Sequence, residues 1–124
     1  MSDALALARR FMDAVEAGDI EAARACFQPD AGIWHNYDGK TQSVDENLAL
    51  LGWMAKRCRA RRYQIRRLEA VEGGYLQQHS LVLELNDGKT VSTEAIALVS
   101  VRDGRIARIE EYLDPGPIGA IAQQ

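Results

Sequence analysis

One residue of this sequence stands out for acid–base chemistry: Glu111, a carboxylate in an otherwise apolar row near the C-terminus. The Asp-Gly pair at 103–104 predicts a tight turn, and the residues that follow, 106–113, are typical of a strand. Because alternate side chains of a strand share one face, Glu111 points the same way as Ile109 and Leu113. The carboxylate is therefore either an edge-strand charge that discourages aggregation or a pocket acid with a perturbed pKa.

The elements that would position this acid are helices in the first half of the chain and strands in the second. Apolar spacing predicts a first helix that stops at Gly18, a second helix over 20–27 that Asp19 caps, and a third helix that begins at the capping box Ser43-x-x-Glu46 and reaches about residue 58. Strands are predicted at 31–37, 63–71, 75–85, 90–101 and 106–113.

The predicted order, α-α-β-α-β-β-β-β, is that of an α+β fold. Hairpin turns are expected at 73–74, 86–88 and 103–104, where glycine supplies the positive φ that such turns need. Strands this long must twist and curl, and helices must cover their inner face. We therefore expect a cone-shaped, strongly curved, mixed or antiparallel sheet around three helices, with a pocket inside the cone.

Composition limits the class of protein further. The chain has 124 residues, 47% hydrophobic and 27% charged, which suits a single domain over residues 1–124. Its net charge of −3 gives no drive toward nucleic acid or an anionic membrane, and no apolar run approaches the roughly 18 residues that cross a bilayer. Cys26 and Cys58 form no C-x-x-C pair, and no signal peptide is apparent, which favours reduced thiols in a cytoplasmic protein.

Three segments carry a family resemblance: FMDAVEAGD at 11–19, FQPDA at 27–31 and DGRIARIEEYLDP at 103–115. With them nearly the whole chain resembles the nuclear transport factor two-like (cystatin-like) superfamily, and within it the SnoaL-type polyketide cyclases and the ketosteroid isomerase-like proteins. The resemblance implies a cofactor-independent isomerase, cyclase or lyase that acts on a small hydrophobic compound, and a homodimer formed through the sheet. This scaffold hosts several reactions and simple binders, so it predicts the fold more narrowly than the reaction.

The resemblance implies an acid–base role for two residues. The essential aspartate on the last strand of the polyketide cyclases and epoxide hydrolases matches Glu111, and the proton-shuttling aspartate of the isomerases matches His35. The isomerase oxyanion-hole tyrosine matches Phe11 and its partner acid matches Ile96, so the usual steroid-isomerase constellation is missing. The arginine–aspartate pair of the epoxide hydrolases is missing as well, since it falls near residues 78 and 80.

The remaining hypothesis is proton transfer next to a carbonyl, with His35 and Glu111 as the catalytic pair. His35 could equally be a structural histidine, and a ligand-binding or interaction domain without chemistry is the alternative function. Enolate donors would come from Trp34, Asn36, Tyr37 or Tyr112. The residues expected to bind substrate are Phe11, Val15, Ile33, Trp53, Met54, Glu94, Ile96, Leu98 and Leu113.

Several of these side chains have a plainer interpretation. Phe11, Trp53 and Met54 have helical spacing that also suits core packing, and Glu94 could be solvated or paired instead of lining a pocket. His79 shares a face with three leucines, and we expect that face to form the outer, dimer-forming side of the sheet in preference to the helix-covered inside. Two histidines on separate strands, without cysteine or carboxylate at ligand spacing, do not predict a metal site.

A run of seven cations lies within twelve residues, 56–67. It is most simply a complement to a helix C-terminus together with a solvated face. An anionic substrate or a coenzyme A thioester at the pocket rim is a weaker alternative, and nucleic-acid binding is disfavoured because aromatic residues do not interleave the run. Residues 115–124 form either a loose tail or a flap over the pocket.

Overall fold

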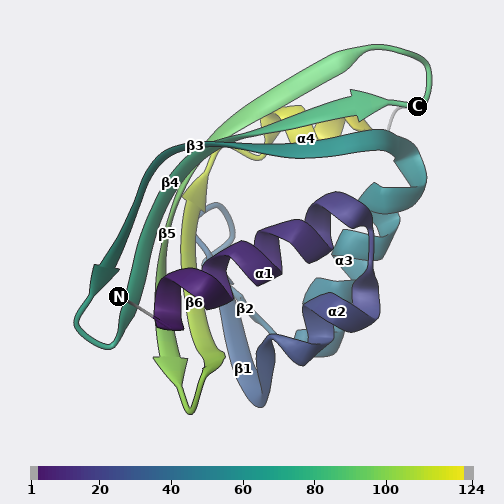
Figure 1. Cartoon of the computed structure of the whole chain (residues 1–124). Coiled ribbons are helices and arrows are strands. Elements are labelled where there is room, and N and C mark those ends of the chain that lie inside the picture. Colours follow the sequence, from purple (N-terminus) through teal and green to yellow (C-terminus); the bar gives the residue numbers. More distant parts are fainter. Residues whose placement is uncertain (1–2, 122–124) are drawn as a thin grey trace.

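A single twisted six-stranded sheet organises the computed structural model, which describes residues 3–121. The helices α1, α2 and α3 lie on one side of this sheet, and the short α4 follows the last strand (Figure 1). The helices are α1 (Asp3–Ala17), α2 (Ile20–Ala25), α3 (Val44–Arg57) and α4 (Gly116–Ile121). The strands are β1 (Phe27–His35), β2 (Thr41–Gln42), β3 (Cys58–Val71), β4 (Gly74–Leu85), β5 (Thr90–Arg102) and β6 (Arg105–Leu113). This arrangement confirms the predicted α+β class and its mixed, curved sheet.

The strand order is β2-β1-β6-β5-β4-β3, so the first long strand lies beside the last one. β3 to β6 form successive antiparallel hairpins, whereas β1 and β6 pair in parallel. In that parallel pair His35 is the register partner of Glu111. The topology therefore brings together two residues that are 76 positions apart in the sequence.

Turn and cap residues act where the sequence predicts them. Asp103 and Gly104 have φ of 52° and 75°, the left-handed pair that a two-residue hairpin turn requires. The Asp19 side chain accepts a hydrogen bond from the Ala22 amide at 3.1 Å. Ser43 and Glu46 form the complete capping box at the start of α3. Local chemistry thus fixes where these elements begin.

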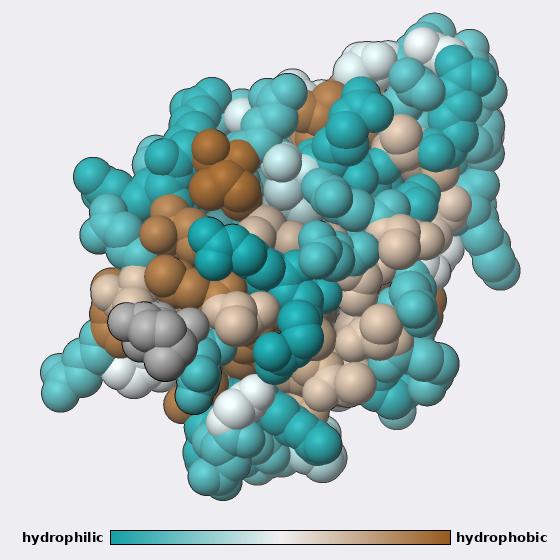
Figure 2. Space-filling model, viewed as in Figure 1, coloured by the Kyte–Doolittle hydropathy of each residue, from teal (hydrophilic) through white to brown (hydrophobic). Residues whose placement is uncertain are grey.

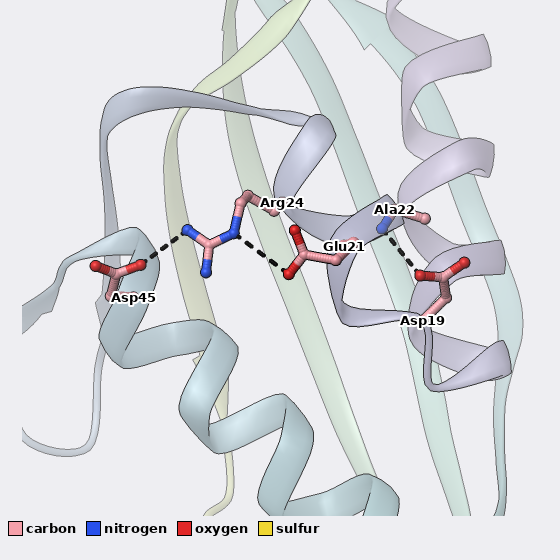
Figure 3. Close-up of polar contacts among 5 residues, drawn as sticks. All are labelled: Asp19, Glu21, Ala22, Arg24 and Asp45. Carbon is pink, nitrogen blue, oxygen red and sulfur yellow. Dashed lines mark hydrogen bonds and ion pairs between the residues drawn. The ribbon is translucent and has the colours of Figure 1, made fainter.

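The second and third helices are joined by an exposed polar cluster (Figure 3). Arg24 on α2 lies between Asp45 on α3, at 2.8 Å, and Glu21 on its own helix, at 3.7 Å. All three side chains are about half exposed or more. Such exposed pairs contribute at most about 1 kcal/mol each, so the cluster orients α2 against α3 and adds little stability.

Two groups of buried apolar side chains hold the helices on the inner face of the sheet. The larger group joins α1, α2 and α3 to the central strands through residues such as Leu7, Ile33 and Ile106. The smaller group joins the end of α3 to β4, where Met54 and Leu83 meet Ile121 of α4. A helical C-terminal segment with a buried residue is therefore part of the core.

Two strands start four or five residues earlier than predicted. β1 starts at Phe27 instead of residue 31, because an irregularity between Phe27 and Gly32 lets the strand continue past Pro29. β3 starts at Cys58 instead of residue 63, directly after α3, with a similar irregularity between Cys58 and Ala60. β2 was not expected. The predicted loose tail or flap is instead the helix α4 as far as residue 121, and residues 122–124 lie outside the described part of the chain.

Candidate functional site

The His35 and Glu111 side chains meet on the inner side of the sheet. His35 Nε2 lies 3.3 Å from Glu111 Oε1, with 5% of the histidine side chain and 22% of the glutamate side chain exposed. Asn36 holds the two strand ends together: its amide donates to the Glu111 carbonyl oxygen, and its side-chain oxygen accepts from the Leu113 amide. The pair is therefore fixed by backbone pairing and by a side-chain clamp at the end of β1.

A cavity of about 70 Å³ lies beside this pair, between the sheet and helices α1 and α3. Half of its lining is apolar and comes from Phe11, Ile33, Leu51, Ala97, Val99 and Ile109. The other half carries polar groups: Asn47, Tyr63, Tyr75, Gln77, His79 and Glu111. The cavity is large enough to admit water or a small ligand, and polar groups make up half of its wall.

The two expected catalytic residues have different positions relative to this cavity. Glu111 is part of the wall, whereas His35 is not and lies behind the carboxylate, in contact with it. Glu111 can touch a ligand directly. His35 can act on a ligand only through Glu111, to which its Nε2 lies within hydrogen-bonding reach.

Two of the expected substrate-binding residues, Phe11 and Ile33, lie in the lining. Four others lie elsewhere in the interior or at its margin. Val15 is buried near the end of α1, and Met54 belongs to the smaller core group. Trp53 stacks under the Arg57 guanidinium at 4.6 Å, and Leu113 is a half-buried residue of β6 outside the lining. The core-packing interpretation is the one that suits Trp53 and Met54.

The expected placement of Glu94, Ile96 and Leu98 in the pocket is wrong. These residues alternate on the outer face of β5, where Ile96 is 38% and Leu98 45% exposed. Glu94 forms an exposed ion pair with Arg66 at 2.6 Å, which is the paired state considered as its alternative. The inner face of β5 is formed by the other set of alternating residues, including Ala97. The strand was identified correctly and its two faces were exchanged.

The expectation for His79 is wrong for the same reason. On β4 the face that carries Tyr75, Gln77 and His79 is buried beneath the helices and contributes to the cavity. The sequence signal was present, since polar side chains alternate there in register with leucines 81, 83 and 85. Because this face of β4 was expected to be the outer one, Tyr75, Gln77 and His79 were not predicted to line the cavity.

Burial shifts the pKa of the groups on this wall. It raises the pKa of Tyr63 and Tyr75 well above that of free tyrosine, and the negative charge of Glu111 adds to the shift in both. Burial also lowers the pKa of His79, against a smaller raising effect of Glu111 and Glu94. At neutral pH both tyrosines are therefore protonated and His79 is uncharged.

The cations of the basic run are largely engaged by the protein itself. Arg59 pairs with Glu84, and Arg67 with Glu69, each within 3 Å. Arg61 donates to four backbone carbonyls at the ends of α1 and α3, those of Val15, Glu16, Ala55 and Cys58. These contacts favour the structural interpretation of the run over an anion-binding rim.

Residues 3–121 contain no group of three side chains that could hold a metal ion, and none of the helices there has the length and apolarity to span a bilayer. Cys26 and Cys58 are free thiols, and burial raises the pKa of both, which makes them poor nucleophiles.

Comparison with known proteins adds a family and a set of structural neighbours. A family model described as a SnoaL-like domain matches residues 8–109. No curated protein sequence matches the chain.

Three solved structures illustrate the range of neighbours. A putative SnoaL-like polyketide cyclase from Shewanella putrefaciens CN-32 is 13% identical, with a TM-score of 0.79 over 100% of this chain and 99% of its own. An NTF2-like protein of unknown function from Burkholderia pseudomallei K96243 is 16% identical, with a TM-score of 0.80 over the full length of both chains. An LEH-like epoxide hydrolase from M. tuberculosis is 20% identical, with a TM-score of 0.77 over 96% of this chain and 88% of its own. At these identities the likeness shows a shared fold, and the activities named for these neighbours differ.

Proposed function

This chain belongs to the SnoaL-like domain family, and we propose that it is a cofactor-independent enzyme that moves a proton at the carbon next to a carbonyl group. The observation that carries the proposal is Glu111, a carboxylate on the wall of a partly enclosed cavity, with His35 Nε2 at 3.3 Å behind it. A base in such a place is partly shielded from bulk water, and the surrounding strands position it for a bound ligand.

The proposed step balances without a further reactant. The Glu111 carboxylate accepts a proton from the carbon next to the carbonyl, and the electrons of that C–H bond form the enolate, with negative charge on oxygen. Glu111, now neutral, returns the proton to another carbon in an isomerisation, or to an oxygen after the enolate has attacked a second carbonyl in a cyclisation. His35 would stabilise the carboxylate between turnovers and take no part in binding.

The size of the cavity supports a small substrate. About 70 Å³ holds the reacting end of a small hydrophobic carbonyl compound, whereas drug-sized ligand pockets span about 300–1,000 Å³. A larger substrate would have to extend past Phe11 and Leu51, the half-buried helix residues of the lining.

A small cavity would also suit the alternative function, a ligand-binding domain without chemistry. A single experiment separates the two. Purified protein is incubated in D₂O with butanone or cyclopent-3-enone, and NMR follows deuterium uptake next to the carbonyl and migration of the double bond. Glu111→Gln should slow exchange by about 10²-fold or more, the usual contribution of a positioned base. Glu110→Gln is the matched control, since Glu110 precedes it in sequence and pairs with Arg108 away from the cavity. Exchange equal in wild type and Glu111→Gln would refute the proposal, and ketone binding without exchange in any variant would establish the binding domain.

The homodimer implied by the resemblance also becomes a proposal. A second copy would cover the outer face of the sheet, where Ile96 and Leu98 are exposed and Tyr112 packs edge-on against Trp34 at 5.2 Å. Figure 2 shows a different side of the molecule, on which polar residues predominate and apolar ones gather beside the start of α1. Sedimentation velocity should give a dimer for wild type and a monomer for Leu98→Glu, while Val71→Glu, at the end of β3, should remain dimeric. A monomeric wild-type protein would end this part of the proposal.

A further inference from the structure

The cavity has a second polar wall that faces Glu111 across β5. In register, Glu111 on β6 pairs with Ala97 on β5, and Ala97 pairs with Gln77 on β4. The backbones of Glu111 and Gln77 therefore lie two strand spacings apart, roughly 10 Å. Alanine fills little of the space between them, so a small ligand above Ala97 would meet the carboxylate on one side and the side chains of β4 on the other.

The first member of this wall is His79, whose orientation is set by its neighbour Gln77. Gln77 Nε2 lies 3.0 Å from His79 Nδ1, and both side chains are buried. An amide nitrogen can only donate, so Nδ1 accepts and the proton of the neutral ring sits on Nε2. The Tyr63 ring meets the imidazole edge-on at 4.8 Å between centroids and restricts it further.

The Nε2–H of His79 is directed toward open space. Within residues 3–121 the His79 side chain makes one hydrogen bond, through Nδ1, and every fully buried side-chain nitrogen or oxygen there has a partner. Nε2 has no such partner, so it cannot be fully buried and must border a space that admits solvent. The cavity that His79 lines is that space. The same reasoning applies to the hydroxyls of Tyr63 and Tyr75, which also line the cavity and have no partner among the described residues.

We propose that His79 Nε2–H, positioned by Gln77, binds the carbonyl oxygen of the ligand together with the hydroxyls of Tyr63 and Tyr75. This inference rests on the proposed function, since it places the oxygen on β3 and β4 and the reacting carbon toward Glu111. It also assigns a substrate class: a neutral ketone or aldehyde with a hydrogen on the adjacent carbon. A carboxylate ligand would find three neutral donors and the charge of Glu111, and should bind poorly.

The chemistry of these donors fits an oxygen that gains charge. An enolate needs hydrogen-bond donors that are fixed in place and shielded from water. The titratable groups around His79 are Tyr63, Glu111 and Glu94, and the effect of burial on its pKa outweighs that of the two carboxylates. The imidazole therefore stays a neutral donor over the physiological range, and the tyrosines stay protonated with it.

The test uses ¹⁵N-histidine NMR of the whole protein. At pH 7 the ¹⁵N shifts of His79 should report the Nε2–H form. Adding cyclopentanone should shift the Nε2 signal, and methylenecyclopentane, which has the same shape but no oxygen, should not. Gln77→Leu should mix the two neutral forms of the ring, while Gln78→Leu, on the opposite face of β4, should leave them unchanged.

A binding measurement completes the design. His79→Phe should raise the dissociation constant of cyclopentanone roughly tenfold, the value of one neutral hydrogen bond, without changing that of methylenecyclopentane. An Nδ1–H ring at pH 7, equal shifts with both probes, or an unchanged constant in His79→Phe would overturn the inference.

The experiment separates failure of the inference from failure of the proposed function. Cyclopentanone should still shift the His79 signal in Glu111→Gln, because that variant keeps the donors. If it does so while Glu111→Gln exchanges protons like wild type, the ketone-binding wall stands and the assignment of the base fails. If Glu111→Gln abolishes exchange but the ketone never reaches His79, the wall fails and the base stands.

Discussion

Replacing Arg61 by methionine tests whether the basic run is structural. The Arg61 guanidinium donates to four carbonyls: Nη1 to Cys58 at 2.7 Å and Ala55 at 3.4 Å, Nε to Val15 at 3.1 Å, and Nη2 to Glu16 at 3.2 Å. One cation thus caps the C-terminal ends of both α1 and α3. Methionine keeps the length and apolar packing of the stem and removes the charge and the donors.

The expected loss is about 3 kcal/mol of unfolding free energy. A cation at a helix C-terminus in a partly buried setting contributes up to about 2 kcal/mol. The backbone carbonyls that lose the charged donor are only partly rehydrated, which adds about 1 kcal/mol to the loss of unfolding free energy. For 124 residues, an unfolding entropy of about 2.1 cal/mol/K per residue converts 3 kcal/mol into a drop of about 12 °C in Tm.

Urea unfolding and calorimetry of Arg61→Met measure this directly. Arg62→Met is the matched control, because Arg62 is the next residue and is exposed. It should change Tm by no more than a degree or two. If the two variants lost equal stability, the capping argument would be wrong. If Arg61→Met kept its stability but lost ketone binding, the run would belong to the site after all.

Three further perturbations test the cavity, a strand contact and a buried histidine. Ala97→Leu should fill the cavity and abolish ketone binding by calorimetric titration while the protein stays folded, and retained affinity would place the ligand elsewhere. Gly74→Ala should be severely destabilised in thermal melts because its Cβ would collide with the Val99 carbonyl oxygen, whereas Gly52→Ala, in open space within α3, should gain about 1 kcal/mol. Stability should fall as pH drops below about 6.5, since burial lowers the pKa of His79 and the unfolded chain then takes up a proton that the folded chain does not. In urea unfolding at pH 7.5 and 5, His79→Phe should show a smaller decline than wild type, and an equal decline would contradict this.

Much of the fold could be predicted because its signals are local. The capping box at Ser43 and Glu46, the Asp19 cap and the Asp-Gly turn at 103–104 depend on residues within four positions of one another. Strand boundaries were less accurate where irregular pairing extends a strand, as at Phe27 and Cys58. Such irregularities depend on the partner strand, which local sequence does not specify.

The candidate site was predicted only in part. Glu111, Phe11 and Ile33 were placed in a pocket and do line the cavity, whereas Glu94 lies on the opposite face of its strand. His79, expected on the outer face, turned out to be on the wall. The errors in β4 and β5 have the same cause. Alternation of side chains along a strand separates its two faces, but it does not show which face the helices will cover.

The sequence alone determined the order of the elements, their caps and turns, and which side chains share a strand face, because these follow from backbone geometry over a few residues. Only the tertiary structure decided that β1 pairs in parallel with β6, which sets His35 against Glu111, and that the face of β4 with Gln77 and His79 looks inward. Both depend on contacts between segments far apart in the chain. The physical reason is that helix packing buries one face of a sheet as a whole, so the inward face is selected by the combined packing of α1, α3 and all the strands.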